Sequence, residues 1–254
     1  MPFATNQGVR IHYEVEGAGE PLVLQHGFSN SLELWRLLGY VDALKDSYRC
    51  ILIDSRGHGL SDKLRDPAAY GTITSAGDVI NVLDDAGVDT AHFWGYSMGG
   101  GIGIALSNLH PDRFRSFVIG GQAPGPRGEG AVAGLRAMVA TLGRGKEAYV
   151  ANLPARWAPL HTEIDTDALI ATLEALSDHP YEEPFAPKVP ALIYNGSADA
   201  PAFRARELKA SATSNLSIEE IPDLNHLEGI DRSDLVLPVV LPFLTAVSKS
   251  AAAS

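Results

Sequence analysis

A short serine-centred segment, Gly95-Tyr96-Ser97-Met98-Gly99, constrains the fold of this chain more than any other part of it. The apolar run before the segment predicts a buried strand, and the glycine-rich run after it predicts a helix. A strand that passes directly into a helix needs a sharp turn, which strains the residue at its tip and exposes that side chain. The pattern therefore predicts a nucleophilic serine, flanked by glycines because a Cβ there would collide with a neighbouring element.

The rest of the chain repeats the alternation of strands and helices. Strand-like runs are predicted at 9–15, 21–25, 49–53, 91–94, 116–120, 191–194 and 216–221, and helices at 32–44, 74–86 and 202–212. We expect the first two runs to be an opening pair of strands joined by a turn at 16–20. Such alternation is typical of a mostly parallel sheet with helices on both faces. Ligands of such sheets bind at the carboxyl ends of the strands, where Ser97 falls.

Between residues 122 and 184 the pattern changes to helices without strands. Helices are predicted at 131–142, 146–153 and 166–177, and four prolines follow before the next strand. We interpret residues 122–184 as a helical lid inserted into a core formed by residues 1–121 and 185–254. The substrate-binding candidates in this lid are Met138, Leu142 and Trp157, with Leu153 and Tyr181 as further apolar residues. Helical spacing of such residues also fits packing within the lid.

Composition limits the classes of partner that the chain can bind. With 254 residues and 45% apolar residues, the sequence predicts one globular domain. The formal net charge of −11 argues against nucleic acid and anionic membranes as partners. Cys50 is the single cysteine, so we expect it to be a packing residue and expect no disulfide and no cysteine-based zinc site. The oligomeric state stays open between monomer and homodimer.

Location is predicted from the two ends of the sequence. The N-terminal residues show no basic region followed by an apolar core, so we expect no secretory signal and a cytoplasmic protein. The longest apolar stretch, 235–247, contains Pro238 and Pro242, and we expect it to be too short to span a bilayer. We predict instead that it forms a terminal helix covering the sheet.

A nucleophilic serine needs a base and a group that orients the base. Of the eight histidines, His226 is placed best, because it follows the last predicted strand and opens on the same sheet edge as Ser97. Asp199 lies in the exit loop of the strand at 191–194. Asp223 is closer to His226 in sequence, but it would have to approach the imidazole awkwardly from the same short loop. The order serine, aspartate, histidine on three strand ends predicts Ser97, Asp199 and His226 as the catalytic residues.

The chemistry also needs amides that bind the developing oxyanion. Met98 offers one backbone N–H at the start of its helix, and Phe28 offers another at the end of an early strand. Gly27 would allow this backbone to approach the reacting carbonyl closely. We predict an oxyanion hole made by Phe28 and Met98, and no requirement for a metal or an organic cofactor.

Together these segments resemble the α/β-hydrolase family. The resemblance rests on 26–28, 54–62, 95–100, Asp199 and His226, and it covers essentially the whole chain. It implies a mostly parallel eight-stranded sheet with helices on both faces and a small helical cap over residues 122–184. It also implies that Arg56 and His58 fix the backbone of a loop bordering the site. Haloalkane dehalogenases and epoxide hydrolases carry aspartate where this chain has serine, so both classes are disfavoured.

The resemblance favours the branch of cap-bearing serine esterases and enol-lactonases. We expect hydrolysis of a small or medium-sized carboxylic ester or lactone through an acyl-enzyme. Enol-lactonase, carbon–carbon bond hydrolase and perhydrolase remain alternatives on the same catalytic residues. A ligand receptor or signalling protein on a hydrolase fold is the alternative from another class.

Overall fold

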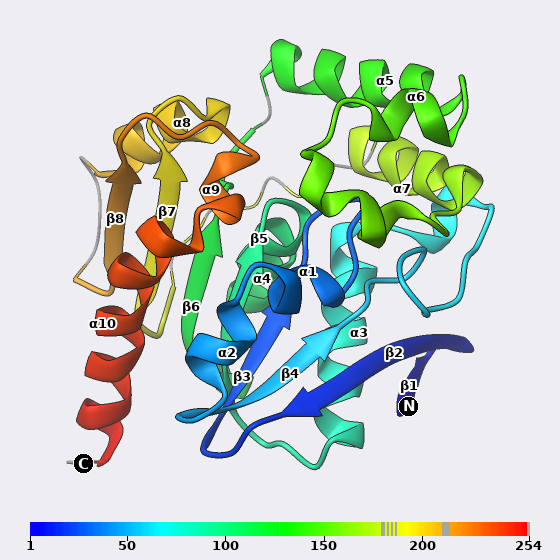
Figure 1. The fold of residues 1–254 in the computed structure, drawn as a ribbon. Coiled ribbons are helices and arrows are strands. Elements are labelled where there is room, and N and C mark those ends of the chain that lie inside the picture. Colours follow the sequence, from blue (N-terminus) through cyan, green and yellow to red (C-terminus); the bar gives the residue numbers. More distant parts are fainter. Residues whose placement is uncertain are drawn as a thin grey trace.

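An eight-stranded sheet forms the centre of the fold (Figure 1). The computed structural model describes residues 1–126, 128–178, 181, 183, 185, 187–209 and 214–252. The strands lie in the order β1-β2-β4-β3-β5-β6-β7-β8, and every neighbouring pair from β4 to β8 is parallel. Their bounds are β1 Phe3–Asn6, β2 Val9–Glu16, β3 Glu20–Gln25, β4 Tyr48–Ile53, β5 Ala91–Tyr96, β6 Phe114–Gly120, β7 Ala191–Gly196 and β8 Leu216–Ile221. The predicted fold class is confirmed.

The two predicted opening strands are present as β2 and β3, but they do not pair with each other. β4 lies between β2 and β3, antiparallel to β2 and parallel to β3. The hairpin partner of β2 is instead β1, which the sequence analysis did not identify. Gln7 and Gly8 join these two strands and both have positive φ, as a two-residue hairpin turn requires. Glutamine is an uncommon residue at such a position, so the turn has a weak sequence signature.

Helices cover both faces of the sheet (Figure 1). On one face, α3 (Thr72–Asp85) and α4 (Met98–Leu109) pack against strand side chains such as Phe93 and Ile119. On the other face, α1 (Glu33–Leu37), α2 (Tyr40–Leu44) and α10 (Ser233–Ala252) pack against Trp94 and Val118. The helix predicted at 32–44 is therefore two helices. They are separated by Gly39, whose φ of 78° cannot continue a helix.

Four helical segments lie between β6 and β7, the three predicted helices and one further 3-10 helix. They are α5 (Glu129–Leu142), α6 (Lys146–Val150), the 3-10 helix η3 (Ala155–His161) and α7 (Thr166–Asp178), and they lie over the carboxyl ends of the strands (Figure 1). Their own core contains Leu142, Tyr149, Leu169 and Leu173. Residue 184, the predicted end of this region, lies outside the described residues.

The shorter elements complete the chain. η1 (Pro67–Ala69) and η2 (Pro111–Arg113) are 3-10 turns, α8 (Ala200–Lys209) follows β7, and α9 (Glu228–Asp231) follows β8. The predicted catalytic residues lie beside the ends of three strands. Ser97 follows β5, Asp199 follows β7, and His226 lies between β8 and α9.

The terminal helix α10 is longer than the apolar stretch from which it was predicted. By length and composition its residues 233–250 are sufficient to cross a membrane, which corrects the expectation that the segment is too short. One face of the helix is buried against the sheet through Val236, Val240 and Leu244. These three contacts agree with the predicted role of the helix as a cover for the sheet.

Candidate active site

The turn between β5 and α4, hereafter the elbow, carries Ser97 and has the predicted strained geometry. Ser97 has φ 55° and ψ −111°, and its amide donates a hydrogen bond to the carbonyl of Gly120 on β6 (2.8 Å). A Cβ on Gly95 would lie 2.2 Å from the carbonyl oxygen of Gly99. A Cβ on Gly99 would lie 2.2 Å from the carbonyl oxygen of Gln25. Close contact between β3, β5 and α4 therefore requires both glycines and fixes the position of the serine.

The structure brings Ser97, His226 and Asp199 together from three strand ends. His226 Nε2 lies 2.8 Å from Ser97 Oγ, and His226 Nδ1 lies 2.8 Å from Asp199 Oδ2. The Asp199 side chain is 2% exposed, whereas that of His226 is 41% exposed. The arrangement thus has a buried carboxylate behind the imidazole and an open side on which a reactant can reach the hydroxyl.

Hydrogen bonds between two loops fix the position of Asp199 relative to His226. The Ala198 amide donates to the Leu224 carbonyl (3.1 Å), and the Ser197 amide donates to the Ile221 carbonyl (2.9 Å). A Cβ on Gly196 would lie 2.1 Å from the Leu224 carbonyl oxygen, so the loops touch there. These contacts connect the exit of β7 directly to the exit of β8.

The segment around His226 is shaped by the start of α9. Asn225 Oδ1 accepts from the amides of Leu227 and Glu228, and the Asn225 amide donates to Glu228 Oε2. This reciprocal pairing holds the turn that leads into the short helix. Asp223, the alternative acid, is exposed, and no contact between its carboxylate and another described residue is present.

Phe28 and Met98 border the same space. Both line the cavity that contains Ser97, and no acceptor among the described residues contacts either amide. Met98 is the first residue of α4, where an amide has no partner within the helix. A Cβ on Gly27 would lie 3.3 Å from the Tyr96 carbonyl oxygen, so the turn approaches the elbow closely. The two amides are thus available to an oxyanion beside the serine.

The turn before Phe28 is fixed by a buried histidine. His26 Nε2 accepts a hydrogen bond from the Ser55 amide (3.0 Å), which places the ring proton on Nδ1, 2.7 Å from the Gly27 carbonyl oxygen. Burial lowers the pKa of His26, so the ring stays neutral. On the other side, Tyr149 of α6 donates to the hydroxyl of Ser29 (2.8 Å). The role expected for His26, supporting the turn without reaching the substrate, agrees with these contacts.

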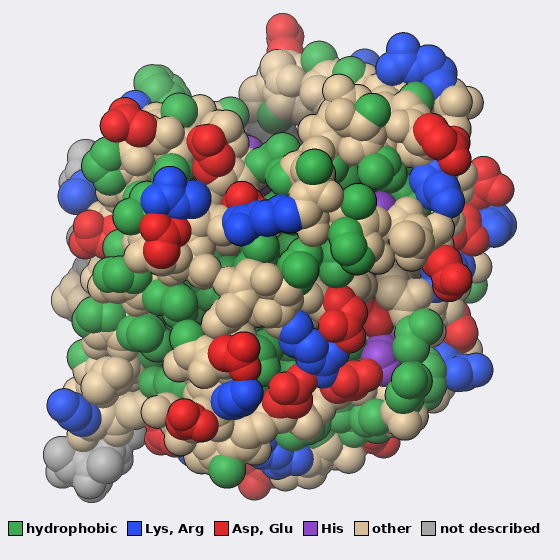
Figure 2. Space-filling view, viewed as in Figure 1, with side chains coloured by type: hydrophobic (Ala, Val, Ile, Leu, Met, Phe, Trp, Pro, Cys, Tyr) green, Lys and Arg blue, Asp and Glu red, His purple; other side chains and the backbone are tan. Residues whose placement is uncertain are grey.

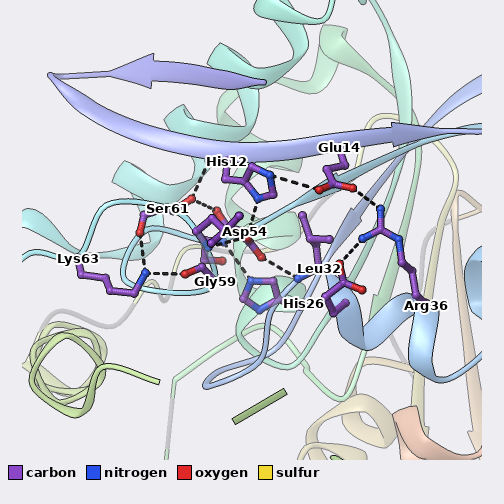
Figure 3. A network of polar contacts seen from close by, with 12 residues as sticks. His12, Glu14, His26, Leu32, Arg36, Asp54, Gly59, Ser61 and Lys63 are labelled. Atoms are coloured by element: carbon purple, nitrogen blue, oxygen red, sulfur yellow. Dashed lines mark hydrogen bonds and ion pairs between the residues drawn. The ribbon is translucent and has the colours of Figure 1, made fainter. Parts of the chain in front are cut away.

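The loop at 54–62 is organised around one buried carboxylate (Figure 3). Asp54 accepts hydrogen bonds from the amides of Leu32 and Leu60 (2.8 and 2.9 Å), and lies 2.8 Å from Nδ1 of His12. Burial alone would raise the pKa of Asp54, but the bond with His12 and the two amides lower it below its usual value. The loop is therefore held by its own polar contacts.

Arg56 and His58 of this loop also make structural contacts. Arg56 pairs with Asp78 of α3 through two hydrogen bonds of 2.7 and 2.6 Å, with both side chains buried. His58 Nδ1 lies 2.9 Å from the Arg56 carbonyl oxygen, and burial lowers the pKa of His58 to about 3. Neither side chain reaches Ser97 or His226, as expected for residues that fix backbone.

A cavity of about 870 Å³ opens above Ser97. On the molecular surface a hollow lined by hydrophobic side chains lies between α8 and the helices α5 to α7 (Figure 2). Met138, Leu153 and Trp157 are among its lining residues, as predicted. Trp157 is held by a hydrogen bond from its Nε1 to Asp231 of α9 (2.7 Å), which ties η3 to the helix after His226.

Two of the apolar residues predicted to line the cavity do not do so. Leu142 is 1% exposed and packs inside the core of α5, α6 and α7, because it lies on the face of α5 that turns towards α7. Tyr181 packs against the main core beside the sheet, and its hydroxyl accepts from Asn108 Nδ2 (3.1 Å). Three polar residues that no local motif predicts also line the cavity: Gln122, Asn152 and Arg204.

Within the described residues, no group of three or more histidine, cysteine, aspartate or glutamate side chains is placed to hold a metal ion. Cys50 is buried, and burial raises the pKa of its thiol to about 12.

A family model described as alpha/beta hydrolase fold matches residues 20–163 of the 254. The chain belongs to the alpha/beta hydrolase fold family. The match runs from β3 through the serine turn to η3 and so includes the first part of the region between β6 and β7. The two other strand ends of the alpha/beta hydrolase site, with Asp199 and His226, follow the matched segment.

Relatives within the alpha/beta hydrolase family align with about half of the chain. The RutD protein of Azorhizobium caulinodans is 37% identical over 119 residues, 47% of this chain and 43% of RutD. Epoxide hydrolase B of Mycobacterium tuberculosis is 37% identical over 117 residues, 44% of this chain and 32% of that enzyme. The aligned segment thus spans less than half the length of these relatives.

Solved structures align over nearly the whole chain. The enol-lactonase of Burkholderia xenovorans LB400 has a TM-score of 0.80 and 27% identity, covering 96% of this chain and 100% of that one. A thermophilic esterase from Thermogutta terrifontis has a TM-score of 0.76 and 20% identity, covering 96% and 97%, which indicates a shared fold. These similarities agree with the resemblance inferred from the motifs.

Proposed function

We propose that the protein is a serine hydrolase that cleaves small or medium-sized carboxylic esters through an acyl-enzyme. The observation that carries the proposal is the pair of 2.8 Å contacts joining Ser97, His226 and Asp199. In the proposed mechanism, His226 removes the proton from the Ser97 hydroxyl as it attacks the ester carbonyl, and then gives this proton to the leaving alcohol. Water repeats the sequence on the acyl-enzyme.

The surrounding groups have separate roles in this mechanism. Asp199 holds the Nδ1 proton of His226, so that Nε2 faces the serine and the imidazolium is stabilised when it forms. The amides of Phe28 and Met98 bind the oxyanion of the tetrahedral intermediate. The helices within 122–184 act as a cap whose residues, Met138 and Trp157 among them, select the acyl or alcohol group.

The serine at the elbow argues against epoxide opening, despite the likeness to Epoxide hydrolase B. A carboxylate that opens an epoxide forms an ester, which water can hydrolyse. Ser97 would form an ether, which has no carbonyl for water to attack, so the enzyme would not turn over. Acyl substrates therefore fit this site better than epoxides.

Lactone hydrolysis is the second candidate, favoured by the likeness to an enol-lactonase over 96% of the chain. A lactone is a cyclic ester, so the same attack by Ser97 opens the ring and leaves the alcohol on the acyl group. Carbon–carbon bond hydrolysis and perhydrolysis on the same residues stay predictions, as do a cytoplasmic location and the absence of nucleic-acid and membrane partners.

The proposal is tested with the Ser97→Ala variant on p-nitrophenyl acetate and butyrate. We expect a loss of kcat of about 10³-fold or more, because the nucleophile is removed, with an unchanged circular dichroism spectrum. Residual activity within tenfold of the wild-type protein would contradict the proposal. A single burst followed by a stably modified Ser97 or His226, without turnover, would favour the receptor alternative.

A further inference from the structure

The residue that precedes the serine, Tyr96, makes a contact that local sequence could not reveal. Its hydroxyl donates a hydrogen bond to the backbone carbonyl of His226 (2.6 Å), across 130 positions in the sequence. The Tyr96 ring also lies beside the His226 imidazole, with centroids 5.5 Å apart. The strand that carries the nucleophile is thereby tied to the loop that carries the base.

The Tyr96 side chain is buried and closely surrounded, so its hydroxyl has little freedom to move. The side chain is 3% exposed. A Cβ on Gly121 would lie 2.5 Å from Tyr96 Cζ, and a Cβ on Gly229 would lie 2.4 Å from its hydroxyl oxygen. Two glycines thus leave just enough room for the ring, one on the β6 side and one on α9. Burial raises the pKa of Tyr96 well above its usual value, so the phenol stays protonated and remains a donor.

The other contacts of the His226 loop described above run to the exit of β7 and to α9. Asp199 fixes the rotation of the ring through Nδ1, but the imidazole is on a side chain that is 41% exposed. Asn225 and Glu228 fix the start of α9 relative to the loop itself, not relative to Ser97. Among the described residues, the Tyr96 hydroxyl supplies the direct side-chain hydrogen bond between β5 and the backbone of His226.

We propose that Tyr96 is a positioning residue. Its hydrogen bond to the His226 carbonyl fixes the His226 backbone and so sets the distance between Ser97 Oγ and His226 Nε2. This inference rests on the proposed function, because it assigns Tyr96 a role in the same proton transfer. Displacement of a catalytic group by a fraction of an ångström to one ångström lowers a rate without changing substrate affinity to the same degree. The tether should therefore act on kcat more than on KM.

The test is Tyr96→Phe, which removes the hydroxyl and keeps the ring. We expect kcat for p-nitrophenyl butyrate to fall about tenfold or more with KM changed less than twofold. The inactivation rate of Ser97 by diisopropyl fluorophosphate should fall in parallel, because it needs the same base. The matched control is Tyr194→Phe: Tyr194 is also buried, on β7, which β6 separates from β5, and its hydroxyl accepts from Trp94 instead (3.3 Å). We expect the control to keep kcat within threefold.

A second variant, Gly229→Ala, should disturb the hydrogen bond between Tyr96 and His226 without altering the tyrosine. Its methyl group would push against the Tyr96 hydroxyl, so kcat and the inactivation rate should again fall together. Near-wild-type kcat in Tyr96→Phe, or an equal loss of kcat in Tyr194→Phe, would overturn the inference. If the wild-type protein hydrolyses no ester, the proposed function fails, while the inactivation rates still decide whether Tyr96 controls the reactivity of Ser97.

Discussion

At the scale of single residues, the site separates two aspartates that the sequence places near one histidine. Asp199 is buried and contacts Nδ1 of His226, whereas Asp223 is exposed three residues before the histidine. Asp223 has φ 61°, in the left-handed region that non-glycine residues seldom adopt. Distance along the chain is therefore a poor guide to which carboxylate orients an imidazole.

The matching prediction compares Asp199→Asn with Asp223→Asn. An asparagine at 199 would donate its amide proton to Nδ1 and hold the wrong tautomer of His226, so kcat should fall about 10⁴-fold. Asparagine tolerates positive φ, so Asp223→Asn should keep kcat within about twofold. Steady-state hydrolysis of p-nitrophenyl butyrate by both variants measures the difference. Comparable losses in the two would show that Asp199 has no special role.

At the scale of elements, the elbow depends on how closely β3, β5 and α4 approach one another. Glycine in a helix costs stability relative to alanine, yet three consecutive glycines follow Met98 in the first turn of α4. Gly99 is required because its Cα lies against the backbone of β3, at the carbonyl of Gln25. The exposed Gly134 in α5 has no atom near its missing Cβ and carries no such requirement.

We therefore expect opposite effects from the same substitution in two helices. Gly99→Ala should lower the free energy of unfolding by about 3 kcal/mol or more, because a methyl group would overlap backbone atoms that cannot move aside. Gly134→Ala should raise it by about 0.5–1 kcal/mol through helix propensity. Urea denaturation followed by circular dichroism measures both values. Equal stability of the two variants would contradict the close packing of α4 on β3.

At the scale of the whole molecule, buried neutral histidines make the fold sensitive to acid. Burial lowers the pKa of four histidines, one beside the oxyanion turn, one in the 54–62 loop, one on β5 and one at the end of η3: His26, His58, His92 and His161. The unfolded chain binds protons on these groups below the ordinary histidine pKa of about 6.5, and the folded chain does not. Their contribution to stability is present above that pH and is lost as the pH falls.

His58 gives this prediction a magnitude. With a folded pKa of about 3, its contribution should decrease by about 2 kcal/mol between pH 7 and pH 5. The free energy of unfolding should fall between pH 7 and pH 5 in the wild-type protein and in His58→Gln. Because the variant lacks the His58 contribution, its decrease should be smaller by about 2 kcal/mol. Urea denaturation at the two pH values measures it. The same pH dependence in both proteins would mean that His58 is protonated in the folded state.

The sequence was sufficient to predict those features that depend on steric constraints within a few residues or on the order of elements along the chain. A glycine-serine-glycine turn between a strand and a helix has few alternatives, so Ser97 could be identified locally, and the order of strand ends then selected Asp199 and His226. Amphipathic periodicity likewise identified most helices, but it could not separate Leu142, which packs among α5, α6 and α7, from Met138, which lines the cavity. Both residues repeat at helical spacing, and only the position of the neighbouring helix distinguishes them.

The sequence by itself determined the fold class, the serine at the elbow and the order in which the other two strand ends follow it. Only the tertiary structure decided that β4 lies between β2 and β3, that Gly39 divides the first helix, and that Tyr96 reaches the carbonyl of His226. The reason is physical: turn strain and hydrophobic periodicity act within a few residues. Strand order and the contact between Tyr96 and His226 depend on crossovers that bring distant parts of the chain together.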